Sequence, residues 1–327
     1  MRVRCSHPSF TGVHVFQKAR PTARNPEHRA SVSRFPLNCV KSQAGPQLFG
    51  DANFPTDAEG RTYHVGTKKG EVANRVLTVG CHKRAAALAE FLEPLDNDEE
   101  VFCYESKRRF VTFTGMFRGT PVSIVATMMG MPNMDFVVRE TRAVVEGPMA
   151  ILRLGSCGGI QPPARLGNLA VASKGSICIR RNPDAFSNSN GSCPPYTLCH
   201  PALPDERLTK LLIEEGQRQF GEDAVVECLN ASADSFYSSQ GRVGVAFHDK
   251  NESLIEHVVE EYPDAVSLEM ETFQLLDLAR CSQGSIAAAG ACLVLAERYT
   301  NAFLDLQGLH DLESKAGMAC LMALCRY

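Results

Sequence analysis

The sequence predicts an α/β fold in which a mainly parallel sheet is covered by helices on both faces. Between residues 75 and 298, short apolar runs rich in β-branched residues alternate with segments of helical periodicity. Such alternation is typical of parallel strands joined by crossover helices. Glycine and polar residues directly follow several of the apolar runs, at the carboxyl ends of strands, where ligands collect in folds of this kind.

The first half of the pattern starts with an apolar strand at 75–81 and a run of strong helix formers at 82–92. Residues 110–129 divide at the sequence RGT into two alternating runs, which predicts a hairpin. Residues 134–147 then carry apolar side chains at helical spacing and stop at a glycine, which predicts a helix.

The second half continues the alternation without an internal repeat. Each run of β-branched or small apolar residues is read as a strand, and each amphipathic run as a helix. Strands are expected at 150–159, 169–179, 224–232, 265–272 and 286–298, and helices at 205–221, 252–262 and 273–281.

Composition excludes several classes of partner. The 327-residue chain carries 34 basic and 37 acidic side chains, so its net charge of −3 gives no general attraction to nucleic acid or to an anionic membrane. Its longest apolar runs fall short of the roughly 20 residues needed to span a bilayer. The 13 cysteines include no CxxC pair, which predicts reduced thiols in the cytoplasm, without a disulfide framework or a zinc site. The expected partner is a small molecule.

Residues 1–60 are expected to be an N-terminal extension and linker, and the domain is assigned to residues 61–327. Residues 1–40 are rich in arginine and contain a single acid, Glu27, without the apolar centre of a secretory signal. A disordered tail, an over-extended start and a mitochondrial transit peptide are all open for this stretch. The stretch that follows, up to residue 60, is rich in turn-forming residues.

Two strand ends carry groups suited to an anion. Gly80 closes the first strand, and Arg84 follows in the first turn of the next helix, where backbone N–H groups and a guanidinium attract negative charge. Arg153 lies between leucines inside a later strand and is followed by Gly155 and Ser156. An arginine buried there would need an anionic partner. The alternative for Gly80 and Arg84 is an ordinary turn with a surface arginine. The alternative for Arg153 is an arginine that reaches solvent at a sheet edge.

A third strand end carries two acids, Glu269 and Glu271, on either side of Met270. Paired carboxylates can act as general acid and base, bind a cation, or accept hydrogen bonds from the vicinal hydroxyls of a sugar. The alternative to a ligand site is an acid at the start of a helix, where its negative charge complements the helix dipole. A ligand with a phosphate and a sugar also needs a site for a base. Phe236 offers a ring on which a base can stack, and Gln240 and Arg242 offer an amide and donors that suit the imide edge of a base.

Taken together, these stretches resemble the uridine phosphorylases of the nucleoside phosphorylase-I family. SFYSSQGR is similar to the family's FYxxQxR signature, RLGSCGGIQ to its RxGTxGxIQ strand, and LEMET to its YEMES motif; the resemblance runs from Tyr63 to Asn301. It implies a single-domain three-layer α/β/α nucleoside phosphorylase fold with a central mixed, mainly parallel twisted sheet.

The resemblance implies a role for each site residue. Phosphate would be held by Gly80, Arg84, Arg153 and Ser156, the ribose by Glu271 with Met270 against the sugar and Glu269 as companion acid, and uracil by Gln240 and Arg242, with Phe236 beside the ring and Arg298 near O4. Arg153, Gln240 and Arg242 are expected to be catalytic. Arg108 and His64 resemble residues that the family lends to the neighbouring subunit, for phosphate and for the ribose 5′-hydroxyl, which implies a homodimer with shared active sites.

The activity implied is reversible phosphorolysis of uridine to uracil and ribose 1-phosphate, for pyrimidine salvage, with deoxyuridine or thymidine as further substrates. Phosphate would attack the anomeric carbon while the leaving uracil gains negative charge. No cofactor is expected, because inorganic phosphate is the co-substrate. A structural cation at the subunit interface is open, although Arg109 stands where bacterial members carry a glutamate that helps to bind it.

Besides Arg109, the chain departs from the family pattern at three places. Cys81 and His82 replace an acid and a proline in the phosphate turn, and residues 126–135 replace a more glycine-rich stretch. Residues 180–206 resemble an inserted surface loop, which favours a simple dimer over the bacterial hexamer.

Other activities compete with this reading. A purine nucleoside phosphorylase or a nucleosidase of the same superfamily is the nearest, and a non-catalytic nucleoside-binding member is another. Purine members usually carry a catalytic acid near the position of Arg298, and hydrolases have no use for Arg84, Arg108 and Arg153. Retention of all the sub-sites argues against a non-catalytic protein.

Overall fold

The computed structural model describes residues 39–41, 49–95, 98–187 and 193–327. The chain separates into two units, Met1–Pro36 and Leu37–Tyr327. The first unit lies outside the described residues, and so do the predictions of a tail or transit peptide made for it. The domain boundary at residue 60 stays a prediction.

The strands of the described residues form one 14-stranded mixed sheet. Its order is β1-β3-β4-β5-β2-β6-β12-β11-β8-β9, while β13 pairs with β6, β7 and β14, and β7 pairs with β10. The central neighbours β5, β2, β6 and β13 run parallel. The strands are β1 Val40–Lys41, β2 Arg75–Val79, β3 Phe102–Glu105, β4 Val111–Phe117, β5 Thr120–Ala126, β6 Met149–Gly159, β7 Leu169–Val171, β8 Ser176–Arg181, β9 Tyr196–Leu198, β10 Val225–Glu227, β11 Leu229–Ala233, β12 Ala265–Glu269, β13 Ile286–Glu297 and β14 Ala302–Phe303.

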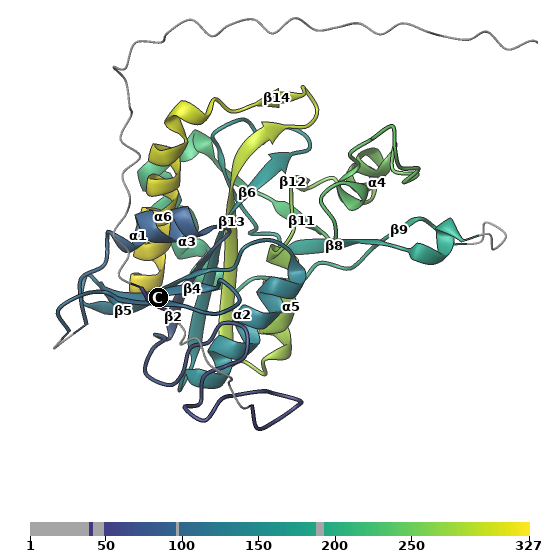
Figure 1. Cartoon of the computed structure of the whole chain (residues 1–327). Helices are drawn as coiled ribbons and strands as arrows, with labels where there is room; N and C mark the ends of the chain where they lie inside the picture. Colours follow the sequence, from purple (N-terminus) through teal and green to yellow (C-terminus); the bar gives the residue numbers. More distant parts are fainter. Residues whose placement is uncertain (1–38, 42–48, 96–97, 188–192) are drawn as a thin grey trace, which may run out of the picture. The chain divides into compact units, whose positions relative to one another are not determined.

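Helices cover both faces of the central sheet (Figure 1). On one face, α1, α3 and α6 pack through an apolar cluster that includes Leu88, Leu208 and Leu321. On the other, α2 and α5 pack through a cluster that includes Met134 and Leu275. The predicted three-layer α/β/α fold is therefore confirmed. The helices are α1 His82–Ala89, α2 Met131–Val144, α3 Glu206–Phe220, α4 Leu254–Glu261, α5 Thr272–Cys281 and α6 Leu309–Arg326, with 3-10 turns η1 Pro183–Phe186, η2 Glu222–Ala224, η3 Ser238–Gln240 and η4 Leu306–Gly308.

The predicted hairpin is confirmed. β4 and β5 pair antiparallel from Val111↔Ala126 to Phe117↔Thr120. The two residues of its turn, Arg118 and Gly119, have φ of 49° and 80°. A two-residue turn with both φ values positive has the twist that antiparallel strands require.

Two predicted strands are each divided in the structure. The run 169–179 forms β7 and β8, and the run 224–232 forms β10 and β11, because the chain changes sheet partner within each run. β7 pairs with β13 and β10, whereas β8 pairs with β11 and β9. Gly175, with φ 94°, makes the turn between β7 and β8. The surface loop predicted at 180–206 contains η1 and β9, and β9 extends the sheet edge beside β8 (Figure 1).

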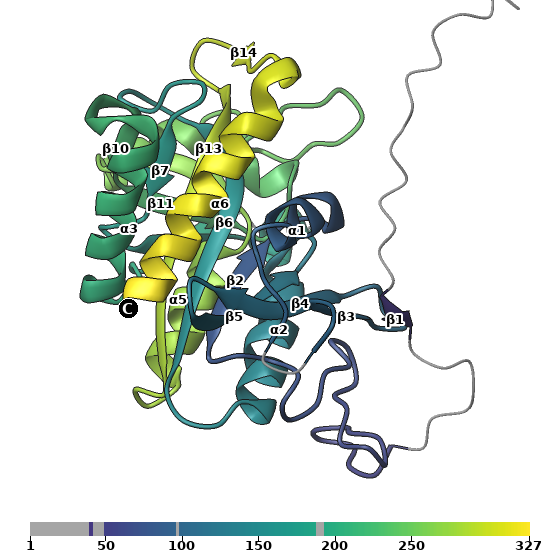
Figure 2. The same ribbon diagram turned by 90° about the vertical axis from the view of Figure 1, so that its left-hand side faces the viewer.

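Helix α6 was not predicted, yet it is the longest helix among the described residues, with 18. It lies along β6 and β13 beside α3 and α1 (Figure 2). Its contact with α1 is close, because a Cβ on Gly317 would overlap the side chain of Leu88. None of the described helices combines the length and the apolar character that crossing a bilayer requires.

The expectation that the thiols are all reduced was wrong for one pair. Cys39 and Cys103 form a disulfide that joins positions 64 residues apart, with a Cα–Cα distance of 4.7 Å. The parallel pairing of β1 with β3, in register Val40↔Tyr104, brings the two cysteines together. Spacing along the chain gives no sign of such a pairing.

Candidate active site

A pocket of about 340 Å³ opens beside the ends of β2 and β12 and along β6. It gathers ten of the thirteen predicted site residues from four separate segments of the chain. The predicted residues that line it are Gly80, Arg84, Arg153, Ser156, Phe236, Gln240, Arg242, Glu269, Met270 and Glu271. His64, Arg108 and Arg298 do not line it.

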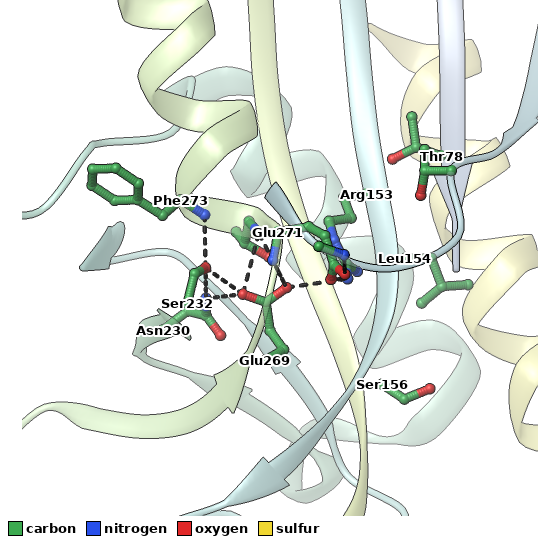
Figure 3. Close-up of polar contacts among 12 residues, drawn as sticks. Thr78, Arg153, Leu154, Ser156, Asn230, Ser232, Glu269, Glu271 and Phe273 are labelled. Atoms are coloured by element: carbon green, nitrogen blue, oxygen red, sulfur yellow. Dashed lines mark hydrogen bonds and ion pairs between the residues drawn. The ribbon is translucent and has the colours of Figure 1, made fainter. Parts of the chain in front are cut away.

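The Glu269 carboxylate is buried and caps the start of α5 (Figure 3). It accepts hydrogen bonds from the backbone N–H of Glu271 at 2.9 Å and of Thr272 at 3.1 Å. Asn230 Nδ2, on the neighbouring strand β11, donates to it at 2.8 Å, and the Ser232 hydroxyl also donates. These bonds saturate Glu269 with protein donors, so its geometry is that of a fixed support for the helix start.

Arg153 joins Glu269 and Glu271, which are two residues apart in the chain (Figure 3). Arg153 Nη2 forms an ion pair with Glu271 Oε2 and lies 3.1 Å from Glu269 Oε2. The backbone N–H of Gly130, at the start of α2, donates to Glu271 Oε1. All three charged side chains are buried, with exposed fractions of 3% to 4%.

Burial and mutual charge shift the pKa of each group in this triad. Burial lowers the pKa of Arg153, but the charges of Glu271 and Glu269 outweigh it and hold the pKa above its ordinary value. Burial raises the pKa of Glu271, and the nearby Glu269 charge adds to this, while Arg153 opposes it. For Glu269 burial also favours the protonated form, but Arg153 and the hydrogen bonds from Ser232 and Asn230 leave its pKa lowered. Of the two acids, Glu271 is therefore the one that more readily takes up a proton.

Arg153 still has donors to offer. Its Nε and Nη1 atoms are buried without a hydrogen-bond partner among the described residues. The side chain folds back over Gly155, where a Cβ would overlap Nη1, so the glycine after Leu154 makes room for the guanidinium. Unpaired buried donors are costly, and a bound anion would satisfy them.

Arg84 approaches the same part of the pocket from the first turn of α1. Its Nη2 donates to the Ser156 hydroxyl at 2.8 Å and to Glu313 Oε1 at 2.7 Å, and its Nε donates to the same Glu313 oxygen at 2.9 Å. Glu313 belongs to α6. Helix α6 therefore fixes the orientation of an arginine that is 229 residues away in the sequence.

The other end of the pocket is formed by the loop that contains η3. The Arg242 guanidinium lies 4.1 Å from the Phe236 ring centre, and its Nη2 is 3.4 Å from Gln240 Oε1. Behind the loop, Arg298 donates to the carbonyls of Gln240 at 3.0 Å and Gly241 at 3.2 Å. Arg298 thus contacts the loop backbone, while its side chain stays outside the pocket lining.

Arg242 and Arg298 form a cationic pair that has no acidic partner among the described residues. Neither makes an ion pair within the described part of the chain. Burial lowers the pKa of both guanidiniums, and the charge of Arg242 lowers that of Arg298 further. Two close cations without a counter-charge favour a ligand that carries or develops negative charge at this end.

His64 and Arg108 lie together away from the pocket of their own chain. Arg108 Nη2 donates to the Tyr63 hydroxyl at 2.8 Å. His64 stacks on Phe136 with ring centres 3.7 Å apart, and its Nδ1 is 2.6 Å from Glu140 Oε1. The buried Glu140 also accepts from the backbone N–H of His64, at 3.0 Å, so the loop is rigidly held. Exposed Arg108 and half-buried His64 therefore form a preformed surface rather than part of this chain's own pocket.

Several residues that hold the site in place were missed by sequence reasoning. They are Gly130, Glu140, Asn230, Ser232 and Glu313. Asn230 and Ser232 alternate on a strand otherwise made of small apolar residues, and Glu140 stands on the apolar face of its predicted helix. Polar residues on a buried face are a usable signal. For Gly130 and Glu313 no local signal exists, because their partners are far away in the sequence.

The Phosphorylase superfamily matches residues 74–326, which include every element from β2 to α6. The chain belongs to this superfamily. The match includes α6, so the helix that carries Glu313 is part of the shared domain.

Relatives of this phosphorylase-superfamily protein include both pyrimidine and purine enzymes. It is 30% identical to the uridine phosphorylase of Thermococcus kodakarensis over 260 residues, which cover 79% of this chain and 85% of the relative. A solved structure from a study of two uridine phosphorylases of the oomycete Phytophthora capsici is 41% identical, with a TM-score of 0.80, and covers 85% of this chain and 98% of the other. The DeoD-type purine nucleoside phosphorylase of Geobacillus kaustophilus is 36% identical over 120 residues, 36% of this chain and 48% of the relative.

Proposed function

We propose that this protein catalyses the reversible phosphorolysis of uridine to uracil and ribose 1-phosphate, in pyrimidine salvage, with deoxyuridine and thymidine as further substrates. The observation that carries the proposal is the arrangement of charge along one pocket. Arg153 offers unpaired buried donors at one end, and Arg242 and Gln240 face the other end without an acid. Glu271 lines the same pocket, in contact with Arg153, and is an acceptor for hydroxyl groups. The similarity to uridine phosphorylases, which covers 79% to 85% of this chain, supports the same substrate.

Phosphate is assigned to the end formed by Gly80, Arg84, Arg153 and Ser156. Arg84 and Ser156 are already joined by a hydrogen bond, and Glu313 fixes the arginine from behind. Among the described residues, Arg153 Nε and Nη1 have no hydrogen-bond partner and the N-cap side chain does not cap the start of α1, so phosphate would displace no partner of these groups. The cationic cradle lowers the cost of bringing a polyanion up to the sugar.

The ribose is assigned to Glu271, with Met270 against the sugar and Glu269 as the fixed support of the helix start. A carboxylate accepts two hydroxyl hydrogen bonds, which suits the 2′ and 3′ positions. Arg153 contacts Glu271 directly, so the same guanidinium would orient the sugar acceptor and the attacking phosphate. As the glycosidic bond stretches, the anionic phosphate and Glu271 stabilise the positive charge that develops on the ribose.

Uracil is assigned to Gln240 and Arg242, with Phe236 at the ring. Negative charge grows on the base as it leaves, and a guanidinium without an acid partner stabilises that charge. Arg298 holds the carbonyls of Gln240 and Gly241, so it positions the loop and adds a second cation behind O4. Every charge that changes in the reaction has a protein group facing it, and the proposal requires no cofactor. A structural cation at a subunit interface and cytoplasmic localisation stay predictions.

Uracil release from uridine tests the activity. We expect release to require inorganic phosphate and to be negligible with inosine as substrate, because Gln240 and Arg242 match the imide edge of uracil. The change in ultraviolet absorbance on cleavage gives the rate. Cleavage of uridine without phosphate would indicate a nucleosidase, and equal cleavage of inosine would indicate a purine-type enzyme. Tight nucleoside binding without turnover would indicate the non-catalytic alternative.

A homodimer with shared active sites is part of the proposal, since His64 and Arg108 lie outside the pocket of their own chain. We expect Arg108→Ala and Arg242→Ala proteins each to be nearly inactive. Unfolding and refolding them together should restore about a quarter of the wild-type activity, because half of the dimers carry both variants and each of these has one intact site. Mixing without refolding is the control. Absence of any recovery would contradict the shared site.

The raised pKa of Glu271 predicts a pH dependence. The carboxylate is the acceptor for the ribose hydroxyls, so kcat/KM for uridine should fall as the pH is lowered and Glu271 takes up a proton. Because burial raises the pKa, this loss should begin at a higher pH than for an ordinary glutamate. The ratio of wild-type to Glu271→Gln activity at each pH removes the ionisation of phosphate itself. A ratio that is constant with pH would exclude Glu271 as the titrating group.

A further inference from the structure

Cys81 places an exposed thiol in the phosphate end of the pocket. It is the N-cap residue of α1, with an extended backbone at φ −153° and ψ 157°, and its side chain makes no capping hydrogen bond. An N-cap side chain lies over the first-turn N–H groups, and the third helical position after Cys81 is Arg84. The thiol therefore borders the groups that are assigned to phosphate.

A second and independent feature of the same pocket points to an anion. Arg153 is 4% exposed, lines the pocket, and has Nε and Nη1 without a partner among the described residues. Arg84 adds a further buried guanidinium. Glu269 and Glu271 pair with Arg153, and Glu313 pairs with Arg84, so the attraction to an anion comes from the two Arg153 donors that these carboxylates leave unpaired among the described residues. An anionic molecule that accepts from these donors is held with its body against Cys81. Neutral molecules of the same size gain no such attraction.

We infer that Cys81 is a modification site for anionic low-molecular-weight disulfides. Glutathione disulfide is a molecule of this class and serves as the probe. The Cys81 thiolate attacks one sulfur of the disulfide and forms a mixed disulfide. The original S–S bond breaks, and the second sulfur leaves as a thiolate that takes a proton from water. Cys81 is thereby oxidised, and the released thiol carries the electron pair. The attached anion then occupies the phosphate end, so the modified protein is inactive until excess thiol reverses the exchange.

The other cysteines provide an internal comparison. Cys193 and Cys281 are exposed but do not line the pocket. Cys157 lines the pocket but is 6% exposed, and contact with Cys292, together with burial, raises its pKa. The thiolate is the reactive form of cysteine, so Cys157 is expected to be slow. Cys81 alone among these combines exposure with a place in the pocket that holds the unpaired Arg153 donors.

Charge-selective alkylation tests the site without reference to activity. The full-length protein is treated with iodoacetate or with iodoacetamide, and the label on Cys81, Cys193 and Cys281 is followed by peptide mass spectrometry. The ratio of iodoacetate to iodoacetamide rates at Cys81 should exceed the ratio at the two control cysteines by about tenfold or more. Saturating inorganic phosphate should slow labelling at Cys81 only. Equal ratios at the three cysteines, or labelling that ignores phosphate, would overturn the inference.

Glutathione disulfide then tests the consequence. Uridine phosphorolysis should fall in proportion to the fraction of Cys81 that is thiolated, and dithiothreitol should restore it. A Cys81→Ser variant should keep its own untreated rate under the same conditions, and loss of that rate would overturn the inference. The inference rests on the proposed function for its effect on activity only. If phosphate protects Cys81 from labelling but the protein does not cleave uridine, the proposed function is refuted and the Cys81 site stands. If the protein cleaves uridine but Cys81 is not labelled, the Cys81 site is refuted and the proposed function stands.

Discussion

Arg153→Met is expected to remove most of the activity and to destabilise the fold at the same time. The change takes away the donors that we assign to phosphate, and removing one preorganised donor costs about 100- to 1,000-fold in rate. It also leaves Glu269 and Glu271 buried without their cation, a loss of about 3 to 5 kcal/mol in the free energy of unfolding. Steady-state kinetics and urea unfolding measure the two effects separately.

A double variant separates catalysis from stability. Arg153→Met combined with Glu271→Gln removes the uncompensated charge together with the cation, so most of the lost unfolding free energy should return. Activity should stay low, because neither the phosphate donor nor the ribose acceptor is restored. A double variant that regains activity along with stability would show that Arg153 acts only through the fold.

Arg242→Ala is expected to lower kcat/KM for uridine by about 100- to 1,000-fold. Arg242 lies beside Gln240 and Phe236 and has no acid partner among the described residues, so its charge is available to the departing base. The loss should be smaller for 5-fluorouridine, whose base leaves as a more stable anion. The KM for phosphate should change little, since Arg242 lies at the other end of the pocket.

Arg180→Ala is the matched control for this change. Arg180 is an exposed arginine at the end of β8 and does not line the pocket. Arg180→Ala changes the net charge of the protein by the same amount as Arg242→Ala. The kinetic constants for both substrates should stay at their wild-type values. A fully active Arg242→Ala variant would refute the assignment of the base site. An equal loss of kcat/KM for uridine and 5-fluorouridine would show that Arg242 binds the base but does not stabilise the negative charge on the leaving base.

Much of the pocket could be predicted because its residues occupy strand ends and turns that local sequence reveals. Glu269 ends a strand and Glu271 starts the following helix, and Gly80 and Arg84 stand at a strand-to-helix turn. Parallel neighbours such as β2 and β6 end on the same side of the sheet, so residues at these ends converge. Ten predicted residues do meet in one pocket.

The two acids of the pocket floor have different environments. The family resemblance assigned the ribose to Glu271 and a companion role to Glu269, but it gave none of the contacts that make the two acids differ. Glu269 is saturated by Asn230, Ser232 and backbone N–H groups, whereas Glu271 contacts Arg153 and the N–H of Gly130. The strand register that sets Ser232 opposite Glu269 decides which acid is fixed and which faces the substrate. Register between distant strands leaves no mark in the local pattern.

The sequence by itself determined the alternation of strands and helices, the hairpin turn and the identity of half of the residues that line the pocket, since periodicity and turn chemistry act between near neighbours in the chain. The tertiary structure decided the pairings that make those residues a site: Arg84 with Glu313, Arg153 with Glu271, and Cys39 with Cys103. It also decided that His64 and Arg108 lie outside their own pocket. These contacts join positions far apart in the sequence, and they form only when the packing of the whole domain brings the chain segments together.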